Sequence, residues 1–393
     1  MEQILLYRRP TGHWGTRNHV LVLPLVASAS GVARAIARDS AAVWVEHDYE
    51  PRPDELPQNR ERIARTFAGF AAHPNVAAVL LVADTPQRAP LLDAILASGQ
   101  RADLVVVTEA GGVRAAVQQG RERLRPLLAH AAACRRERAP VGTLMLGTEC
   151  GGSDALSGIT ANPALGEASD LLVDAGGTVI LAETTELIGA EHLLARRAAS
   201  RAVADDIYRI IHRYEAVVRA HGEDIRGANP APGNIEGGLT TIEEKSLGAA
   251  KKGGTRPIQQ VVEYAVRPQT AGLVIMDTPG NDIEQMVGMT AAGCQVAVFT
   301  TGRGTPTGSP IIPVIKVATN SRTAERMRDN IDLDAGLILD GRETLATMGR
   351  RIYEMILAVA QGELTKAERL GHREFSVSRY PFAALDAEAT PVR

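Results

Sequence analysis

A thiol, two carboxylates and a hydroxyl lie close together in residues 147–166, which read GTECGGSDALSGITANPALG after the apolar run VGTLML. The glycine pair that follows Cys150 would let backbone N–H groups approach an anion, and the neighbouring Ser153 and Asp154 can form hydrogen bonds. A cysteine in this position is either a small core residue or a reactive or metal-binding thiol. The acidic neighbours of Cys150 favour the second role, and a helix that starts at ALSGI would favour a bound carboxylate.

Acidic and basic side chains also follow other apolar runs in the C-terminal half of the chain. Glu183 and Glu186 follow the run TVILA, and His192 lies beside Glu191 at the start of a helix-like segment. Imidazole and carboxylate groups near a thiolate suit iron or manganese, so these residues could hold a divalent metal. An acidic residue at a helix start is equally often a partner of the helix dipole, and this alternative stays open.

Three further polar residues have positions that suit substrate binding or proton transfer. Asp277 ends the run LVIM, and Arg303 lies between two glycines in TTGRGTP, where its planar guanidinium could hold a substrate carboxylate. Lys245, in TTIEEKSLG, is a candidate base. The alternatives are an ordinary turn after Asp277, a surface ion pair at Arg303 and a solvated helical lysine at Lys245.

Short apolar runs predict the strands that must position these residues. The runs are continuous rather than alternating, which is typical of strands buried on both faces of a parallel sheet. Helix-like segments rich in Ala, Leu and Arg lie between them, so the sequence predicts an α/β fold. Ligands of open α/β sheets bind at the carboxyl ends of the strands, so the polar loops after four strands should line one pocket. The predicted strands are VLVLPLV from Val20, AAVWV from Ala41, VAAVLLVA from Val76, DLVVVT from Asp103, TLMLG from Thr143, TVILA from Thr178, LVIMD from Leu273 and VAVFTT from Val296.

The chain of 393 residues is long enough for two units, each with largely parallel sheets flanked by helices. The charged segment CRRERAP, residues 134–140, is predicted to be a linker or a helix end, which divides the chain into units 1–137 and 138–393. Residues 227–254 are dense in Gly, Pro and Asn around one short helical pattern, which predicts a long functional loop.

Composition excludes several classes of partner. The 43 Lys and Arg residues against 46 Asp and Glu residues give a net charge of −3, and no basic run indicates binding to nucleic acid or to a membrane surface. No apolar run reaches the roughly 20 residues that span a bilayer, and MEQILLYRRP lacks the plan of a signal peptide. Three separated cysteines without CxxC spacing fit a reducing cytoplasm. Neither GxGxxG nor GxxxxGK[ST] occurs at a strand end, so no nucleotide cofactor is expected.

Long stretches of the chain resemble the altronate/galactarate dehydratase family. The resemblance rests on GTECGGSDALSGITANPALG and the residues that follow it, on NPAPGNIEGGLTTIEEKSLGAAKKGGTRPI, MDTPGND and FTTGRGTPTGSPIIPVIKVATNS, and on YRRPTGHWGTRNHVLVLP near the start. These motifs cover most of the chain and are similar to the catalytic core of that family. They also resemble the large subunit of a sulfolactate sulfo-lyase.

The resemblance implies a cytoplasmic carbon–oxygen lyase that depends on a divalent metal, with iron(II) expected, and removes water from a sugar acid. In the sulfo-lyase, sulfite leaves instead. Both reactions remove a proton beside a carboxylate and expel the β-substituent from an enolate-like intermediate. The expected substrate is therefore a small hydroxy-carboxylate, and a homo-oligomer is the default for an enzyme of this size.

Position, residue type and the resemblance together define the candidate site. The predicted catalytic residues are Cys150, Asp154, His192 and Lys245. Cys150 and Glu183 are predicted to bind the metal. The predicted substrate-binding residues are Gly151, Gly152, Ser153, Asn162, Asp277, Thr301 and Arg303.

Two departures from the family pattern lead to further expectations. Family members often carry or recruit a small additional domain, whereas this sequence starts at the core motif, so a separate small subunit is expected to complete the pocket. Cysteines that follow early strands in the family are missing here, and His47 and Asp48 are the nearest polar candidates, with His47 as a predicted metal ligand. The alternative is a non-catalytic homologue that binds a carboxylate but has lost the metal chemistry.

Overall fold

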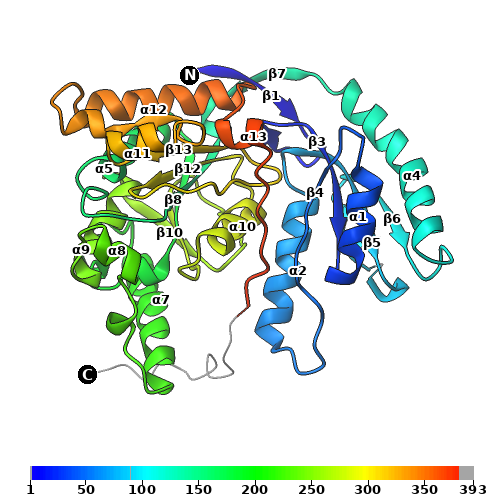
Figure 1. The fold of residues 1–393 in the computed structure, drawn as a ribbon, viewed down its shortest axis with the longest axis horizontal. Helices are drawn as coiled ribbons and strands as arrows, with labels where there is room; N and C mark the ends of the chain where they lie inside the picture. The colour runs from blue at the N-terminus through cyan, green and yellow to red at the C-terminus, as the bar shows by residue number, and fades with distance from the viewer. Residues whose placement is uncertain (1, 89, 380–393) are drawn as a thin grey trace.

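The computed structural model describes residues 2–88 and 90–379. Two sheets with flanking helices stand side by side, and the chain passes from the first to the second through a small third sheet (Figure 1). All neighbouring strands in the two larger sheets are parallel. The predicted α/β fold with largely parallel sheets is therefore confirmed.

The larger sheet has seven strands in the order β10-β11-β9-β8-β12-β13-β14. The five strands from β11 to β13 are buried at every residue, as expected for strands covered by helices on both faces. The chain runs from β8 to β9, adds β10 and β11 on that side, and then returns to β12 on the other side of β8. The strands are β8 Met145–Cys150, β9 Thr178–Leu181, β10 Ile258–Val262, β11 Gly272–Met276, β12 Val296–Thr301, β13 Val314–Ala318 and β14 Leu333–Asp334.

The smaller sheet has four strands in the order β4-β3-β5-β6. All eight predicted apolar runs form strands in the two large sheets, although AAVWV contributes only two residues. The strands of the smaller sheet are β3 His19–Pro24, β4 Val43–Trp44, β5 Val76–Ala83 and β6 Arg101–Val106.

Helices form layers on the faces of both sheets. Buried side chains of α5 and α12 pack on one face of the seven-stranded sheet, and those of α1 and α4 pack on the outer face of the four-stranded sheet. The bounds of these helices are α1 Ser30–Ala37, α4 Val113–Ala133, α5 Ala161–Asp174 and α12 Leu345–Ala360, and α3 Pro90–Ala97 precedes β6.

A helix pair joins the two sheets. α2 (Pro57–Ala71) and α10 (Asp282–Ala292) lie between them, within one apolar cluster that takes side chains from both sheets (Figure 1). A Cβ atom at Gly69 of α2 would lie 2.2 Å from the carbonyl oxygen of Ala291. The close approach of these two helices therefore requires a glycine at this position.

The charged segment after α4 differs from its predicted role as a linker or a helix end. Arg136–Pro140 is a strand, β7, which pairs antiparallel with β1 (Gln3–Arg8) in a sheet of order β2-β1-β7. β2 is the short strand Trp14–Gly15. Backbone pairing does not need apolar side chains on a solvent-facing edge strand, so a hydrophobic pattern does not reveal β7.

Short helices surround the carboxyl edge of the seven-stranded sheet. The helix-like sequence from Gly189 to Gly222 forms two helices because Ser200 caps the second and accepts a hydrogen bond from the N–H of Val203. Residues 227–254 were predicted to be a long loop around one short helical pattern. That pattern forms α9, and the segment contains a further short helix, α8. The bounds are α6 Glu191–Ala195, α7 Arg201–Ala220, α8 Pro232–Glu236 and α9 Ile242–Ala250, and the remaining helices are α11 Ser321–Arg326 and α13 Lys366–Leu370. Within the described ranges, no helix combines the length and apolar character needed to cross a membrane.

Candidate active site

The strand order of the seven-stranded sheet reverses beside β8, and Cys150 is the last residue of that strand. Ligands of open α/β proteins bind at such a point, outside the carboxyl ends of the strands. A cavity of about 200 Å³ lies next to Cys150 at this edge. The segment after β8 and helix α9 provide most of its lining, which includes Ser153, Asp154, Asn162 and Lys245.

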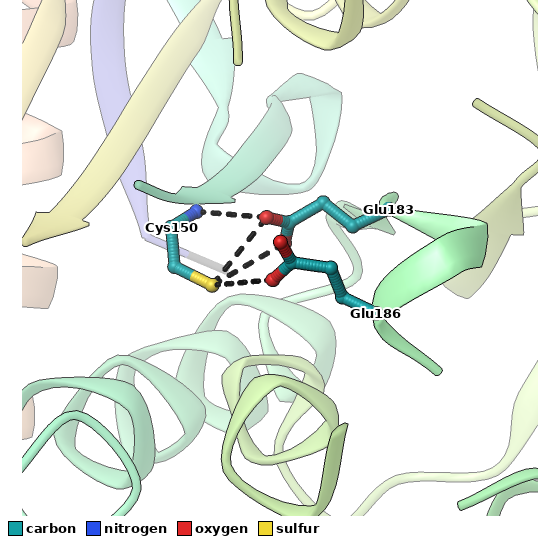
Figure 2. A group of neighbouring side chains, drawn as sticks. All are labelled: Cys150, Glu183 and Glu186. Carbon is teal, nitrogen blue, oxygen red and sulfur yellow. Dashed lines mark hydrogen bonds between the residues drawn. The ribbon is translucent and has the colours of Figure 1, made fainter. Parts of the chain in front are cut away.

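Cys150, Glu183 and Glu186 form a buried cluster at this cavity, and their potential ligand atoms all lie within 4.8 Å of one another. Figure 2 shows the thiol of Cys150 pointing toward the two carboxylates, which come from the loop after β9. The Sγ atom of Cys150 lies 3.4 Å from Oε1 of Glu183 and 3.6 Å from Oε2 of Glu186. The cluster therefore brings together side chains that are more than thirty residues apart in sequence.

A left-handed backbone turn directs Glu183 toward the cysteine. Glu183 has φ of 73°, which is uncommon for a residue other than glycine. Its N–H donates a hydrogen bond to Oγ1 of Thr278 (2.8 Å), and the hydroxyl of Thr184 donates to Oδ1 of Asp277 (2.6 Å). These bonds tie the loop after β9 to the loop after β11 and hold the strained residue in place, as is common at functional sites.

Lys252 connects Cys150 to Glu183. It lies in the single helical turn Lys251–Gly253 that follows α9, and its side chain is completely buried. The ammonium forms an ion pair with Glu183 and donates a hydrogen bond to Sγ of Cys150 over 3.0 Å. One cation therefore compensates the buried carboxylate and contacts the thiol.

Lys245 forms the second ion pair of the cluster. Its Nζ atom lies 2.7 Å from Oε1 of Glu186 and donates hydrogen bonds to the side-chain oxygens of Asn229 (3.0 Å) and Asn234 (3.2 Å). Lys245 also lines the cavity, whereas Glu186 lies behind it. The lysine is thus the charged group of the cluster that a ligand in the cavity would contact directly.

Burial strongly affects the protonation of the acids near Cys150. Burial raises the pKa of the Cys150 thiol to about 11, with Lys252 opposing the change, so the thiol is protonated at neutral pH. Burial and the nearby Asp282 raise the pKa of Glu149 well above its usual range, and neither carboxyl oxygen of Glu149 has a hydrogen-bond partner in the described structure. Burial, with Glu186, also raises the pKa of Asp282 to about 6.

The Cys150 cluster fits a divalent metal ion by donor type and by spacing. One thiolate and two carboxylates suit iron(II) or a similar ion, and the 4.8 Å limit on their separations is compatible with bonds of about 2.0 to 2.3 Å to one ion. Metal binding would release the thiol proton, because the thiolate is the ligand form. It would also place positive charge beside Lys252, so this lysine must lose its proton or move away from Glu183.

Asp154 is buried and lies at the cavity, but its carboxylate is already bound by protein groups. Oδ1 accepts a hydrogen bond from the hydroxyl of Ser157 (2.9 Å), and Oδ2 accepts from Thr319 (2.9 Å) and Asn320 (3.2 Å). The side chain therefore fixes the loop after β8 against the loop after β13. The neighbouring Ser153 lines the cavity and accepts a hydrogen bond from Asn234 through its carbonyl oxygen.

Gly151 and Gly152, which follow Cys150, each need to be glycine for a different steric reason. A Cβ at Gly151 would lie 2.1 Å from Oδ2 of Asp282 and 2.8 Å from the ring of Phe299. Gly152 has φ of 59°, and its carbonyl oxygen accepts hydrogen bonds from the N–H groups of residues 302 and 303. The loops after β8 and β12 are therefore joined through backbone contacts, and Thr301 supports this turn by accepting from the N–H of Gly304.

The remaining predicted substrate-binding residues also contact protein groups. The amide of Asn162 accepts from Thr300 (2.6 Å) and donates to the carbonyl oxygen of Gly248 (3.1 Å) at the cavity wall. Asp277 forms an ion pair with Arg213 of α7. Arg303 is exposed and packs against Gly233 of α8, outside the residues that line the cavity.

Neither predicted histidine joins the Cys150 cluster. His47 lies in the N-terminal half, where Nε2 faces the carbonyl oxygen of Pro24 at 2.9 Å and Nδ1 accepts from the N–H of Tyr49 at 3.2 Å. Burial lowers the pKa of His47, so its ring is neutral. Both ring nitrogens have protein partners. His192 lies in the first turn of α6 and is not among the described residues that line the cavity or form the cluster.

The sequence did not point to Lys252 as a site residue. Glu186 was considered beside Glu183 as a possible metal ligand but was not among the final predicted ligands. A signal for Lys252 exists, because Lys245 and Lys252 are seven residues apart and a helical pattern places such residues on one face. Asn229 and Asn234, in the Gly- and Pro-rich segment, had no comparable signal.

The chain belongs to the D-galactarate/altronate dehydratase family. Residues 141–381 match the family's model for "D-galactarate/Altronate dehydratase, C-terminal", and residues 6–132 match "D-galactarate dehydratase/Altronate hydrolase, second domain". The first match includes the whole Cys150 cluster and both lysines. The family relation inferred from the sequence motifs is therefore confirmed.

Individual relatives carry two different reaction names. The chain is 37% identical over 377 residues to the (2R)-sulfolactate sulfo-lyase subunit beta of Chromohalobacter salexigens, which covers 95% of this chain and 96% of that protein. It is 33% identical over 387 residues to an altronate dehydratase of Bacillus subtilis, covering 94% of this chain and 76% of the relative. It is 44% identical over 229 residues to the L-threo-forming galactarate dehydratase of Escherichia coli, covering 58% of this chain and 44% of the relative.

Proposed function

We propose that this protein is a metal-assisted lyase that removes water from a sugar acid or a related small hydroxy-carboxylate. The observation that carries the proposal is the buried cluster of Cys150, Glu183 and Glu186 beside a cavity that Lys245 lines. Relatives named as altronate and galactarate dehydratases support this reaction class.

Lys245 is the proposed proton-transfer group. In the elimination, the carbon beside the substrate carboxylate loses a proton and the hydroxyl on the next carbon leaves as water, so that an enol forms and becomes a 2-keto acid. The Nζ atom of Lys245 lies 2.7 Å from Glu186, and a divalent ion held by that carboxylate would favour release of the ammonium proton to water, which leaves a neutral amine to take the substrate proton. The same lysine can then protonate the departing hydroxyl, because Asn229 and Asn234 hold its Nζ in position.

Cys150, Glu183 and Glu186 are proposed to hold the metal, with iron(II) favoured by the combination of thiolate and carboxylates. When bound, a divalent ion would stabilise the negative charge that develops on the substrate. Ser153, at the cavity beside Cys150, is proposed to bind a substrate oxygen. Arg303 does not line the cavity but lies next to α8, the helix that carries Asn234, and it is proposed to bind the substrate carboxylate from there.

A second candidate reaction is the release of sulfite from a sulfolactate. The observation that favours it is the 37% identity to a sulfo-lyase subunit along 96% of that relative. The proton transfer by Lys245 would be the same, because both reactions begin beside a carboxylate and differ in the group that leaves.

A separate small protein is proposed to complete the site. The relative from Chromohalobacter salexigens is named as a beta subunit, which identifies it as one component of an assembly. In this chain, Ile159 and Leu247 line the cavity although 56% and 42% of their surfaces are exposed, and the nearby Ile235 is 56% exposed. An apolar rim of this kind suits a protein partner. Two results would contradict this proposal. One is a turnover rate that does not change when candidate small subunits are added, and the other is an Ile159→Asp variant whose turnover in their presence equals that of the parent protein.

The test is to purify the protein without oxygen, measure its bound metals, and assay it with altronate, galactarate and sulfolactate. Release of a 2-keto acid with bound iron supports the dehydratase, and release of sulfite supports the second candidate. Binding of a sugar acid without turnover, in protein loaded with iron and supplied with candidate small subunits, would instead indicate a non-catalytic binding protein.

A further inference from the structure

A second cavity, of about 270 Å³, lies at the opposite edge of the seven-stranded sheet. Met145 and Thr178, the first residues of β8 and β9, line it, whereas Cys150 is at the other end of β8. At about 3.3 Å per residue, this strand separates the two cavities by roughly 17 Å. Residues 12–14, from the motif YRRPTGHWGTRN, also line the second cavity, and the proposed lyase chemistry gives that motif no role.

Arg267 is the charged residue of this cavity. Its guanidinium is largely buried, and burial lowers its pKa. Among residues 2–88 and 90–379, no carboxylate forms an ion pair with Arg267, and its side-chain hydrogen bond is to the ring of His13. Arg267 is partly buried, so its charge is less well solvated than that of a surface arginine, and an anion would stabilise it.

The surroundings of Arg267 hold its guanidinium in a fixed place. Nη2 lies 3.3 Å from Nδ1 of His13, and burial together with Arg267 lowers the pKa of His13, so the neutral ring accepts this hydrogen bond. A Cβ at Gly293 would lie 2.1 Å from Nη1 of Arg267. The missing side chain at Gly293 therefore provides the space that the guanidinium occupies.

The rest of the lining is apolar and neutral polar. Trp14 lines the cavity too, and the guanidinium of Arg8 lies over its ring, 5.9 Å from the ring centroid. Thr143, Thr178 and Thr270 are neighbouring lining residues. A bare inorganic ion would use the guanidinium and leave the indole without contact, whereas a small organic anion would use both.

We propose that this cavity binds a small organic anion whose carboxylate or phosphate group pairs with Arg267 and whose body lies against Trp14. The planar guanidinium suits both kinds of oxyanion through paired hydrogen bonds. The site is separate from the Cys150 cluster, so the proposal does not depend on the lyase reaction.

The fluorescence of Trp14 provides the test, because the chain has only two tryptophans and Trp44→Phe leaves Trp14 as the reporter. Succinate and glycerol 3-phosphate are titrated into this protein at constant ionic strength, with sodium chloride as the blank. A saturable change with either probe supports the site and identifies the anionic group that it prefers. No saturable change with either probe would overturn the proposal.

Two variants in the same background assign the binding to Arg267. Arg267→Gln is expected to weaken binding at least about tenfold, the scale of one charge-assisted contact. Arg342→Gln is the matched control, since Arg342 is exposed and pairs with Asp340, and it should bind normally. Circular dichroism checks the folding of Arg267→Gln, and Arg267→Lys, which keeps the charge but loses the planar fork, should give intermediate affinity. Unchanged affinity in a folded Arg267→Gln protein would refute the assignment.

Discussion

The ammonium nitrogen of Lys252 lies 3.0 Å from the sulfur of Cys150. The same ammonium forms an ion pair with Glu183, and both side chains of that pair are fully buried. Two of the three proposed metal ligands are therefore bound to one lysine. Metal binding at the proposed site would compete with the Lys252 contacts for the same atoms, so we expect this lysine to affect how readily the cluster takes up an ion.

Cys150→Ser should fold normally but lose most turnover. Serine is close to cysteine in size, so packing changes little, whereas the thiolate ligand is lost. We expect turnover to fall by at least about 100-fold, as when one key polar group of an active site is removed, together with a lower iron content. Cys294→Ser is the matched control, because Cys294 is also buried but lies in the apolar cluster between the sheets. Equal activity and equal metal content in the two variants would show that Cys150 serves only in packing.

Lys252→Met should destabilise the metal-free protein by about 3 to 5 kcal/mol, because it leaves Glu183 as a buried charge without its partner. Adding Glu183→Gln to this variant should recover part of the loss. Urea unfolding of the two single variants and the double variant measures the coupling free energy between the residues. Additive effects, within about 0.5 kcal/mol, would show that the ion pair does not contribute to stability.

The stability of the metal-free protein should contain a contribution from Asp282 that decreases as the pH rises. The pKa of this acid is raised from 3.8 to about 6, so the folded state binds its proton more tightly than the unfolded state between these values. Stability from this group is greatest below pH 4 and is lost as the pH approaches 6. Between pH 4 and pH 7, the difference in unfolding free energy between the parent protein and Asp282→Asn should shift in favour of the variant by about 2 to 3 kcal/mol, measured at pH 4, 5, 6 and 7. A difference that does not change with pH would contradict the raised pKa.

Gly151→Ala should lower the melting temperature and abolish activity. The added methyl group would lie 2.1 Å from the carboxylate of Asp282 and 2.8 Å from Phe299. Either these two side chains or the end of β8 must shift, and both changes disturb the surroundings of Cys150. Gly31→Ala in α1 is the control, because a Cβ there meets nothing within 4 Å. That control should be neutral or stabilising by up to about 1 kcal/mol. A Gly151→Ala protein with normal melting and turnover would show that the loop adjusts without cost.

The sequence alone determined the main strands, the α/β class and the family. Strands buried on both faces of a parallel sheet are largely apolar, so β5, β11 and β12 are visible as apolar runs. The carboxyl ends of parallel strands lie on one edge, which is why Cys150 and Glu183 were predicted to meet. The division of the chain near residue 137 stays a prediction, and the charged residues there turned out to form the edge strand β7.

Only the tertiary structure decided which charged groups form pairs. Lys252 and Cys150 are 102 residues apart, and Asp154 meets Thr319 across 165 residues, so their contacts follow from the packing of α9 and of the loop after β13. The residue type of His47 could not show that its ring contacts backbone groups of the N-terminal half and does not join the cluster with Glu183. A side chain's chemistry depends on the partners that compensate its charge. These partners are determined by long-range packing, and long-range packing leaves no periodic pattern in the sequence.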